Sequence, residues 1–284
     1  MKCVSYIAIV GALLVGIIGA GPGSPQQAAP ASPDPCSGTS RLLATLDRPT
    51  IGYSPCAVAP GTVVFEEGYQ NQRQGADFAA GLVQYPQSFT RIGIEQGLEF
   101  DVIGPYYNLQ SAPNGAGGSV FTRGYQDPGL GLKYELKPFA RYIVAFDGLY
   151  TAPMGSQGYS AGAPTYVFNA DIGYSITPTW GVGTTIAFEN LAGVDALGRQ
   201  KRYGAFMPSV ATTKQLNAAT QLYAEYVYLN KLGPDQSGRG TVDYGIQRLF
   251  GTHVELDAEL GSSITADRNL RFHYVGVGFG WQIR

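Results

Sequence analysis

Residues 251–260, with the sequence GTHVELDAEL, carry the pattern that most constrains the fold of this chain. From residue 254 to residue 260, apolar side chains alternate strictly with carboxylates. Because successive side chains on a β-strand point to opposite faces, this segment predicts a strand with one apolar face and one acidic face. A helix, with its period near 3.6 residues, would mix the two kinds of side chain. Three carboxylates on one face require water or cationic partners, which excludes a dry core on that side.

The same alternation recurs along the chain and predicts a series of strands. The abundance of glycine and tyrosine, with 39 and 19 residues, also favours strands and turns over helices. Most candidate strands have about ten residues, the length that a tilted strand needs to cross a bilayer. The candidates cover residues 62–72, 80–94, 97–108, 127–137, 140–153, 164–176, 180–190, 202–213, 219–230, 240–250, 253–263 and 271–283.

The connections between these strands alternate between short and mostly longer ones. The short connections are at residues 95–97, 137–138, 177–179, 214–219 and 251–252. The longer, polar ones are at residues 71–79, 110–123, 155–163, 191–201, 231–240 and 265–269. Bacterial outer-membrane barrels have tight periplasmic turns and larger external loops. We therefore predict an all-β fold, a transmembrane up-and-down antiparallel β-barrel of about 12 strands over residues 61–284.

Aromatic residues help to distinguish this barrel from a soluble sandwich, in which strands would also alternate. Amphipathic rings favour the two lipid–water interfaces. Trp180, Phe250 and Trp281 fall at the periplasmic strand ends of the predicted barrel. Tyrosines fall at the external strand ends, at positions 69, 106, 107, 150, 166, 203 and 228. Their clustering at the ends favours a membrane barrel, although tyrosine is common in any strand.

The N-terminus predicts export. Lys2 precedes an apolar run from Ile7 to Ile18, and small residues follow at Gly19 and Ala20. We interpret residues 1–20 as a secretory signal peptide, with cleavage as late as residue 31. A membrane anchor helix is the alternative, but the run is short for one. Together with the barrel, export predicts a location in the outer membrane of a bacterial cell.

Residues 21–60 form the predicted N-terminal segment of the mature chain. Residues 21–35 are rich in Pro, Ala and Gln and are expected to be disordered. Residues 36–60 are predicted to be a small periplasmic segment, with a plug or a lid on the barrel as the alternative. Cys36 and Cys56 predict a disulfide in an exported chain, worth roughly 3 kcal/mol by the chain-entropy model. Two free thiols are the other interpretation.

Several short motifs resemble, in their order along the chain, a family of outer-membrane transporter-like proteins named for the meta pathway of phenol degradation. They are VVFEEGYQ at 63–70, RIGI at 91–94, GLEF at 97–100, DPGLGLKY at 127–134, YAEY at 223–226, LDA at 256–258 and VGVGF at 275–279. The resemblance implies a channel or transporter for small solutes, with aromatic compounds as one candidate class. It also implies outer-membrane lipid and the barrel assembly machinery as partners.

Alternation assigns most charged strand residues to the lumen of the barrel. The candidate pore-lining residues are Glu66, Arg91, Glu99, Asp101, Lys133, Glu135, Arg141, Asp147, Asp171, Glu189, Glu225, Asp243, Glu255, Asp257 and Glu259. Because rings of charge set the ion preference of a pore, an acidic lumen predicts a preference for cations. The alternative is a structural network in which these carboxylates pair with the basic residues, tyrosine hydroxyls and water.

The functional prediction is a passive outer-membrane channel for small solutes. A structural or adhesive barrel without transport is the alternative, and an outer-membrane lipase-like enzyme is a remote one. The chain has only two histidines, His253 and His273, and no serine is recognisably paired with either. We expect no catalytic residues, no metal ligands and no cofactor. The net charge of −2 provides no electrostatic argument for nucleic acid.

Overall fold

The computed structural model describes residue 36 and residues 41–114, 117–136, 139, 141–265 and 267–283. The helix α1 covers Arg41–Thr45 and the short 3-10 helix η1 covers Arg268–Leu270. The strands are β1 (Val63–Gln74), β2 (Ala80–Tyr85), β3 (Phe89–Glu95), β4 (Leu98–Ile103), β5 (Tyr107–Pro113), β6 (Ser119–Tyr125), β7 (Gly129–Glu135), β8 (Tyr142–Thr151), β9 (Thr165–Thr177), β10 (Trp180–Val194), β11 (Gln200–Asn217), β12 (Thr220–Leu229), β13 (Arg239–Phe250), β14 (Val254–Ile264) and β15 (Phe272–Ile283). No helix within these ranges is long and apolar enough to cross a membrane. The predicted signal peptide and the segment 21–35 lie outside the described residues.

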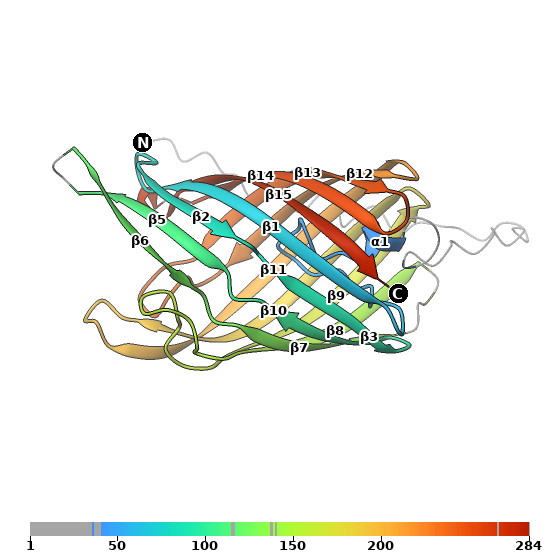
Figure 1. Ribbon diagram of the computed structural model, residues 1–284, viewed down its shortest axis with the longest axis horizontal. Helices are drawn as coiled ribbons and strands as arrows, with labels where there is room; N and C mark the ends of the chain where they lie inside the picture. Colours follow the sequence, from blue (N-terminus) through green and yellow to red (C-terminus); the bar gives the residue numbers. More distant parts are fainter. Residues whose placement is uncertain are drawn as a thin grey trace, which may run out of the picture. The chain divides into compact units, whose positions relative to one another are not determined.

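Twelve strands form a closed antiparallel barrel (Figure 1). Around the wall the order is β1, β3, β4 and then β7 through β15. The pairing of β15 with β1 closes the barrel, in a register that runs from Val63 opposite Ile283 to Gln74 opposite Phe272. The fold class predicted from the alternating pattern is confirmed.

The two ends of the barrel differ in their connections. At one end, called here the short-turn end, residues 178–179 join β9 to β10 and residues 251–253 join β13 to β14. At the other end, called here the long-loop end, residues 152–164 join β8 to β9 and residues 230–238 join β12 to β13. In Figure 1, α1 lies near the short-turn end, where β15 also ends.

Three short segments interrupt the strands at one level of the barrel wall, and two of them fall within strands that were expected to be continuous. The interruptions are residues 86–88 between β2 and β3, 104–106 between β4 and β5, and 126–128 between β6 and β7. Each contains a proline, at position 86, 105 or 128. Because proline has no N–H group to donate within a sheet, it ends the regular pairing. The unbroken strands expected at 80–94 and 97–108 are therefore each two strands.

Strands β2, β5 and β6 extend the sheet beyond this level at the long-loop end. β2 pairs with the second half of β1, β5 pairs with β2, and β6 pairs with β5. In Figure 1 the β5–β6 hairpin projects well past its neighbours. Much of the loop expected at 110–123 thus belongs to this hairpin. The sequence pattern missed it because neither face of β5 or of β6 is uniformly apolar.

The outer face of the barrel is apolar and the inner face is polar. In β14 the three carboxylates are buried, whereas Leu256 and Leu260 are exposed by 47% and 44%. A soluble protein would bury the leucines instead. A row of tyrosine rings runs across four strands near the long-loop end, with successive centroids 6.3, 5.4 and 5.2 Å apart for Tyr69, Tyr85, Tyr107 and Tyr125. The outer surface therefore has the composition of a lipid-facing wall.

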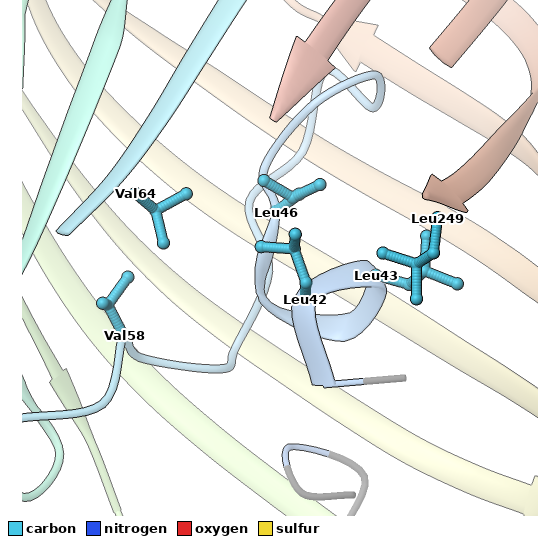
Figure 2. Close-up of a cluster of buried hydrophobic side chains, with 6 residues drawn as sticks. All are labelled: Leu42, Leu43, Leu46, Val58, Val64 and Leu249. Carbon is cyan, nitrogen blue, oxygen red and sulfur yellow. The ribbon is translucent and has the colours of Figure 1, made fainter. Parts of the chain in front are cut away.

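The largest apolar cluster inside the barrel lies at the short-turn end. It joins side chains of the N-terminal segment to side chains of the barrel wall (Figure 2). The cluster consists of Leu42, Leu43, Leu46, Val58, Val64 and Leu249, each exposed by 5% or less. Burial of these apolar side chains stabilises the packing of the N-terminal segment against the short-turn ends of β1 and β13.

Candidate functional site

Residues 41–60, called here the plug, lie inside the barrel. The plug begins with α1 at the short-turn end, and its residues 47–53 contact inner side chains of β1, β7, β10, β12 and β14. Cys36 and Cys56 form a disulfide with their Cα atoms 5.4 Å apart, and both residues are buried. Residues 36–60 were expected to be a small periplasmic segment, with a plug or a lid on the barrel as the alternative. The structure contains the plug.

Carboxylates of the barrel wall hold the plug by its backbone. Glu66 of β1 accepts hydrogen bonds from the amides of Asp47 and Arg48, at 3.0 and 2.8 Å. Glu225 of β12 accepts from the amides of Ile51 and Gly52, at 2.7 and 2.9 Å. A charged acceptor strengthens such bonds, and a buried amide without a partner would be costly. The acidic inner face therefore binds the plug.

Two further wall carboxylates bind the returning part of the plug. Glu99 of β4 accepts from the amide of Val58 at 2.6 Å. Glu135 of β7 accepts from the amide of Ala57 at 2.7 Å. Together with Glu66 and Glu225, they attach both limbs of the plug to the wall.

Arg91 of β3 is a fully buried cation between the wall and the plug. Its guanidinium contacts Glu99 at 2.7 Å and Glu66 at 3.1 Å within the wall. On the plug side it contacts the Asp47 carboxylate at 3.4 Å and donates to the backbone oxygens of Thr45 and Cys56. A buried arginine needs this many acceptors because each unpaired N–H group would be costly.

Lys133 of β7 completes this charged cluster from the opposite side. Its Nζ atom lies 3.3 Å from Asp47 Oδ1 and donates to the backbone oxygen of Ser54 at 3.0 Å. It also lies 5.6 Å from the centre of the Tyr53 ring. Burial raises the pKa of Tyr53 well above its ordinary value, so that its hydroxyl stays neutral. The Asp47 carboxylate of the plug therefore pairs with two cations of the barrel wall, Arg91 and Lys133.

Arg48 of the plug extends toward β14, on a different part of the wall from Arg91 and Lys133. Its Nη2 atom lies 3.2 Å from Asp257 and 3.4 Å from Glu259, both on β14. Burial alone would lower the pKa of Arg48, but the two carboxylates outweigh it and raise the pKa above its ordinary value. The guanidinium fits against Gly68 and Gly278, where a Cβ atom would collide with it. Two glycines that are paired between β1 and β15 thus make room for this side chain.

The structure places nearly all the candidate pore-lining residues on the inner face. Those that are buried are Glu66, Arg91, Glu99, Asp101, Lys133, Asp147, Asp171, Glu225, Asp243, Glu255, Asp257 and Glu259. Glu135 and Glu189 are half-buried on the same face. Arg141 differs: it lies exposed in the turn before β8 and donates to the backbone oxygen of Ile176. The alternation that assigned it to the lumen does not extend into a turn.

Some inner-face carboxylates retain oxygens without a hydrogen-bond partner. Both carboxylate oxygens of Asp243 and of Glu255 are in this state, as is one oxygen of Asp171. Within the described ranges, no group of three or more His, Cys, Asp or Glu side chains is arranged to hold a metal ion. These carboxylates form a polar lining that the plug covers only in part.

Cavities adjoin the described residues of the plug on both sides inside the barrel. The first, of about 410 Å³, lies between the plug and β9–β12 and reaches the short turn at 177–180. The second, of about 290 Å³, lies between the plug and the wall formed by β1, β3, β4 and β15. Both are lined by Arg48, Thr50, Gly52 and Tyr53. The tip of the plug therefore separates two spaces that adjoin it.

Sequence reasoning missed Arg48 and the amide side chains that line the second cavity. Arg48 lies in a segment with no strand pattern, and Gln70 and Gln87 carry no charge. One usable signal was the excess of carboxylates over basic residues on the inner face. This excess indicated that the carboxylates need hydrogen-bond donors from outside the strands, and the plug amides provide them.

Comparison with known proteins supports the fold. No protein-family model matches the chain, and no curated protein matches it. An outer membrane channel from Pseudomonas putida F1 is similar in structure, with a TM-score of 0.62 and 11% identity over 84% of this chain and 100% of that one. The NanC porin is similar with a TM-score of 0.52 and 11% identity over 78% of this chain and 100% of that one.

Outer membrane phospholipase A from Escherichia coli also matches, with a TM-score of 0.43 and 15% identity over 86% of this chain and 97% of that one. This likeness is too low to carry an argument. At identities of 11%, the two better matches show the fold alone, that of bacterial outer-membrane barrels. The resemblance to the meta-pathway family stays a resemblance.

Proposed function

We propose that this chain is a plugged β-barrel channel of the bacterial outer membrane, through which small solutes diffuse passively. The observation that carries the proposal is the pair of cavities that adjoin the same four plug residues, on opposite sides of the plug tip. The first reaches the short turn at 177–180, and the second extends from the plug toward the long-loop end as far as Gln70 and Tyr106. A displacement of the plug tip would join them.

The outer surface supports a membrane location. Leu132 and Leu256 point outward and are exposed by 54% and 47%. Aromatic rings mark both ends of the apolar band, including Trp281 beside Phe65 at 6.2 Å near the short-turn end. Such girdles are typical of barrels in contact with lipid. We propose outer-membrane lipid and the barrel assembly machinery as partners, with the short turns in the periplasm.

The charge of the path supports a preference for cations. Glu225 lines the first cavity, and Glu259 and Asp47 line the second. At the plug tip, one arginine faces two carboxylates, so acidic side chains outnumber basic ones at this contact. Negative side chains along a narrow path favour cations over anions. Glu66, Glu99 and Glu135 act mainly by holding the plug.

Single-channel recording in planar bilayers with a salt gradient tests the proposal. We expect discrete conductance steps and a reversal potential that favours cations. Thr213→Trp fills the first cavity and should lower the conductance. Val210→Trp is the matched control, because Val210 lies on the same strand but points outward with 48% exposure. A wild-type barrel that stays silent at all voltages would contradict transport and favour a structural barrel.

The solute class suggested by the family resemblance is a separate proposal. Growth of a deletion strain on phenolic compounds is its direct test, because loss of an uptake channel should slow growth at low substrate concentration. Unchanged growth would remove aromatic compounds from the proposal and leave the channel itself in place.

A further inference from the structure

A surface of amide side chains covers the inner wall between the plug and the long-loop end. We call it the amide wall, and it consists of Gln70, Gln72, Gln74, Gln84, Gln87 and Asn108. The first three follow one another along the inner face of β1, and Gln84 and Asn108 lie beside Gln70 on β2 and β5. This region lies between the strand interruptions and the long-loop end, above the plug tip.

The amide wall is ordered by a continuous hydrogen-bond network. Gln87 accepts from Arg48 Nη1 at 2.9 Å and donates to Gln70 at 3.2 Å. From Gln70 the bonds continue along β1, with Gln72 donating to Gln74 at 2.9 Å. Such bonds fix the orientation of each amide before a solute arrives, which reduces the entropy lost on binding.

A branch of the network crosses to the neighbouring strands. Gln84 donates to Asn108 at 2.9 Å, and Asn108 donates to the backbone oxygen of Tyr106. An amide group has two N–H donors and an oxygen with two lone pairs. The wall therefore presents donors and acceptors side by side at a regular strand spacing.

The second cavity places aromatic rings next to this wall. Gln70 and Gln87 line it together with Tyr53, Phe89 and Tyr106. Tyr274 lines the same cavity, and Tyr53 and Phe89 meet edge to face at 6.5 Å between centroids. Ring faces pack against apolar C–H groups, while amides and phenol hydroxyls form hydrogen bonds.

The charged groups of this cavity are engaged by one another. Arg48 contacts Asp257 and Glu259, and Asp47 contacts Arg91 and Lys133. The second cavity thus offers a solute amide and phenol groups beside charged groups that already have ionic partners.

We propose that the amide wall and the second cavity form a binding site for a neutral, polyhydroxylated solute such as a mono- or disaccharide. Adjacent hydroxyls on a sugar ring match the paired donors and acceptors of the amides, and the C–H faces of the ring match the aromatic side chains. An apolar aromatic solute would displace water from the amides without replacing its hydrogen bonds. The proposal rests on the channel function and names its solute class.

Binding to the purified full chain in detergent tests the site independently of conductance. Isothermal titration calorimetry with glucose, sucrose and phenol compares the solute classes. We expect saturable binding of at least one sugar. Gln70→Leu and Gln72→Leu should each raise the half-saturating sugar concentration by about ten-fold, the effect of one lost hydrogen bond. Gln215→Leu, in the first cavity, is the matched control and should change it by less than about two-fold.

Gln72 lies one step further from Arg48 than Gln70, so its variant keeps the plug contact and guards against a general loss of structure. Saturable phenol binding without sugar binding would overturn the proposal, as would equal effects of the amide-wall variants and the control. If the barrel binds sugar but stays silent in planar bilayers, the channel fails and the site stands. If the barrel conducts and no sugar binds or blocks the current, the site fails and the channel stands.

Discussion

Arg48 of the plug lies 3.2 Å from Asp257 of β14, a residue 209 positions later in the chain. The same guanidinium donates to Gln87 at the interruption between β2 and β3. One side chain therefore joins the plug tip to two separate parts of the barrel wall. Because both cavities adjoin this residue, these contacts would set how readily the plug tip moves in the proposed channel.

Arg48→Gln should loosen the plug tip. The change leaves Asp257 and Glu259 without their cation, and breaking a buried ion pair from one side costs roughly 3–5 kcal/mol. We expect a higher open probability or a larger conductance in planar bilayers. Arg41→Gln is the control, because the Arg41 guanidinium donates to the backbone oxygen of Ala57 within the plug. Unchanged conductance in Arg48→Gln would show that the tip does not limit the path.

Neutralising Asp257 and Glu259 together, as Asn and Gln, should change the ion preference. The change leaves Arg48 uncompensated at the meeting point of the cavities, so that the net charge there becomes positive. The reversal potential in a salt gradient should shift toward anions. If the double variant keeps the cation preference of the wild type, that preference arises from other carboxylates, such as Glu225.

Arg91→Met should destabilise the barrel rather than merely loosen the plug. It leaves Glu66, Glu99 and Asp47 buried without their shared cation. We expect a loss of roughly 3–5 kcal/mol in the free energy of unfolding, measured by urea titration in lipid vesicles. Arg141→Met removes an exposed turn arginine and should cost less than about 1 kcal/mol. Similar losses for both would argue against the buried network.

Leu256→Arg places a charge on the lipid-facing surface and should cost roughly 2–4 kcal/mol if the site is near the bilayer midplane. The control position must point into the barrel, where there is room for an arginine side chain. Gly131 does not qualify, because a Cβ there would lie 2.5 Å from Leu149 Cδ2. Thr213→Arg, which points into the first cavity, is suitable and should be milder. Equal destabilisation by both variants, in the same vesicle assay, would contradict the assignment of faces.

Replacing both cysteines of the disulfide by serine should affect the plug more than the barrel. The bond closes a loop that contains α1 and the plug tip, and neither cysteine belongs to a strand. The heat-modifiable gel shift should remain, whereas openings in bilayers should become more frequent. Mass spectrometry of the unreduced wild type should find one intramolecular disulfide. Detection of two free thiols in the wild type would contradict the prediction, because the plug would then lack the disulfide.

The sequence by itself determined which face of each strand meets the outside. The pattern of residues 254–260 contains this information locally, because side chains alternate along any strand whatever its partners are. The same argument assigned Glu66, Glu99 and Glu225 to the inner face correctly. It failed for Arg141, which lies in a turn, and for the β5–β6 hairpin, whose polar strands lack an apolar face.

Only the tertiary structure decided what the inward carboxylates contact. Glu66 binds amides 18 and 19 residues earlier, and Glu225 binds amides more than 170 residues earlier, in a segment without any strand pattern. Charge predicted that these groups need donors, but backbone amides carry no signature in a sequence. The register of twelve strands brings distant carboxylates to one lumen, and the physical need to satisfy them there holds the plug in place.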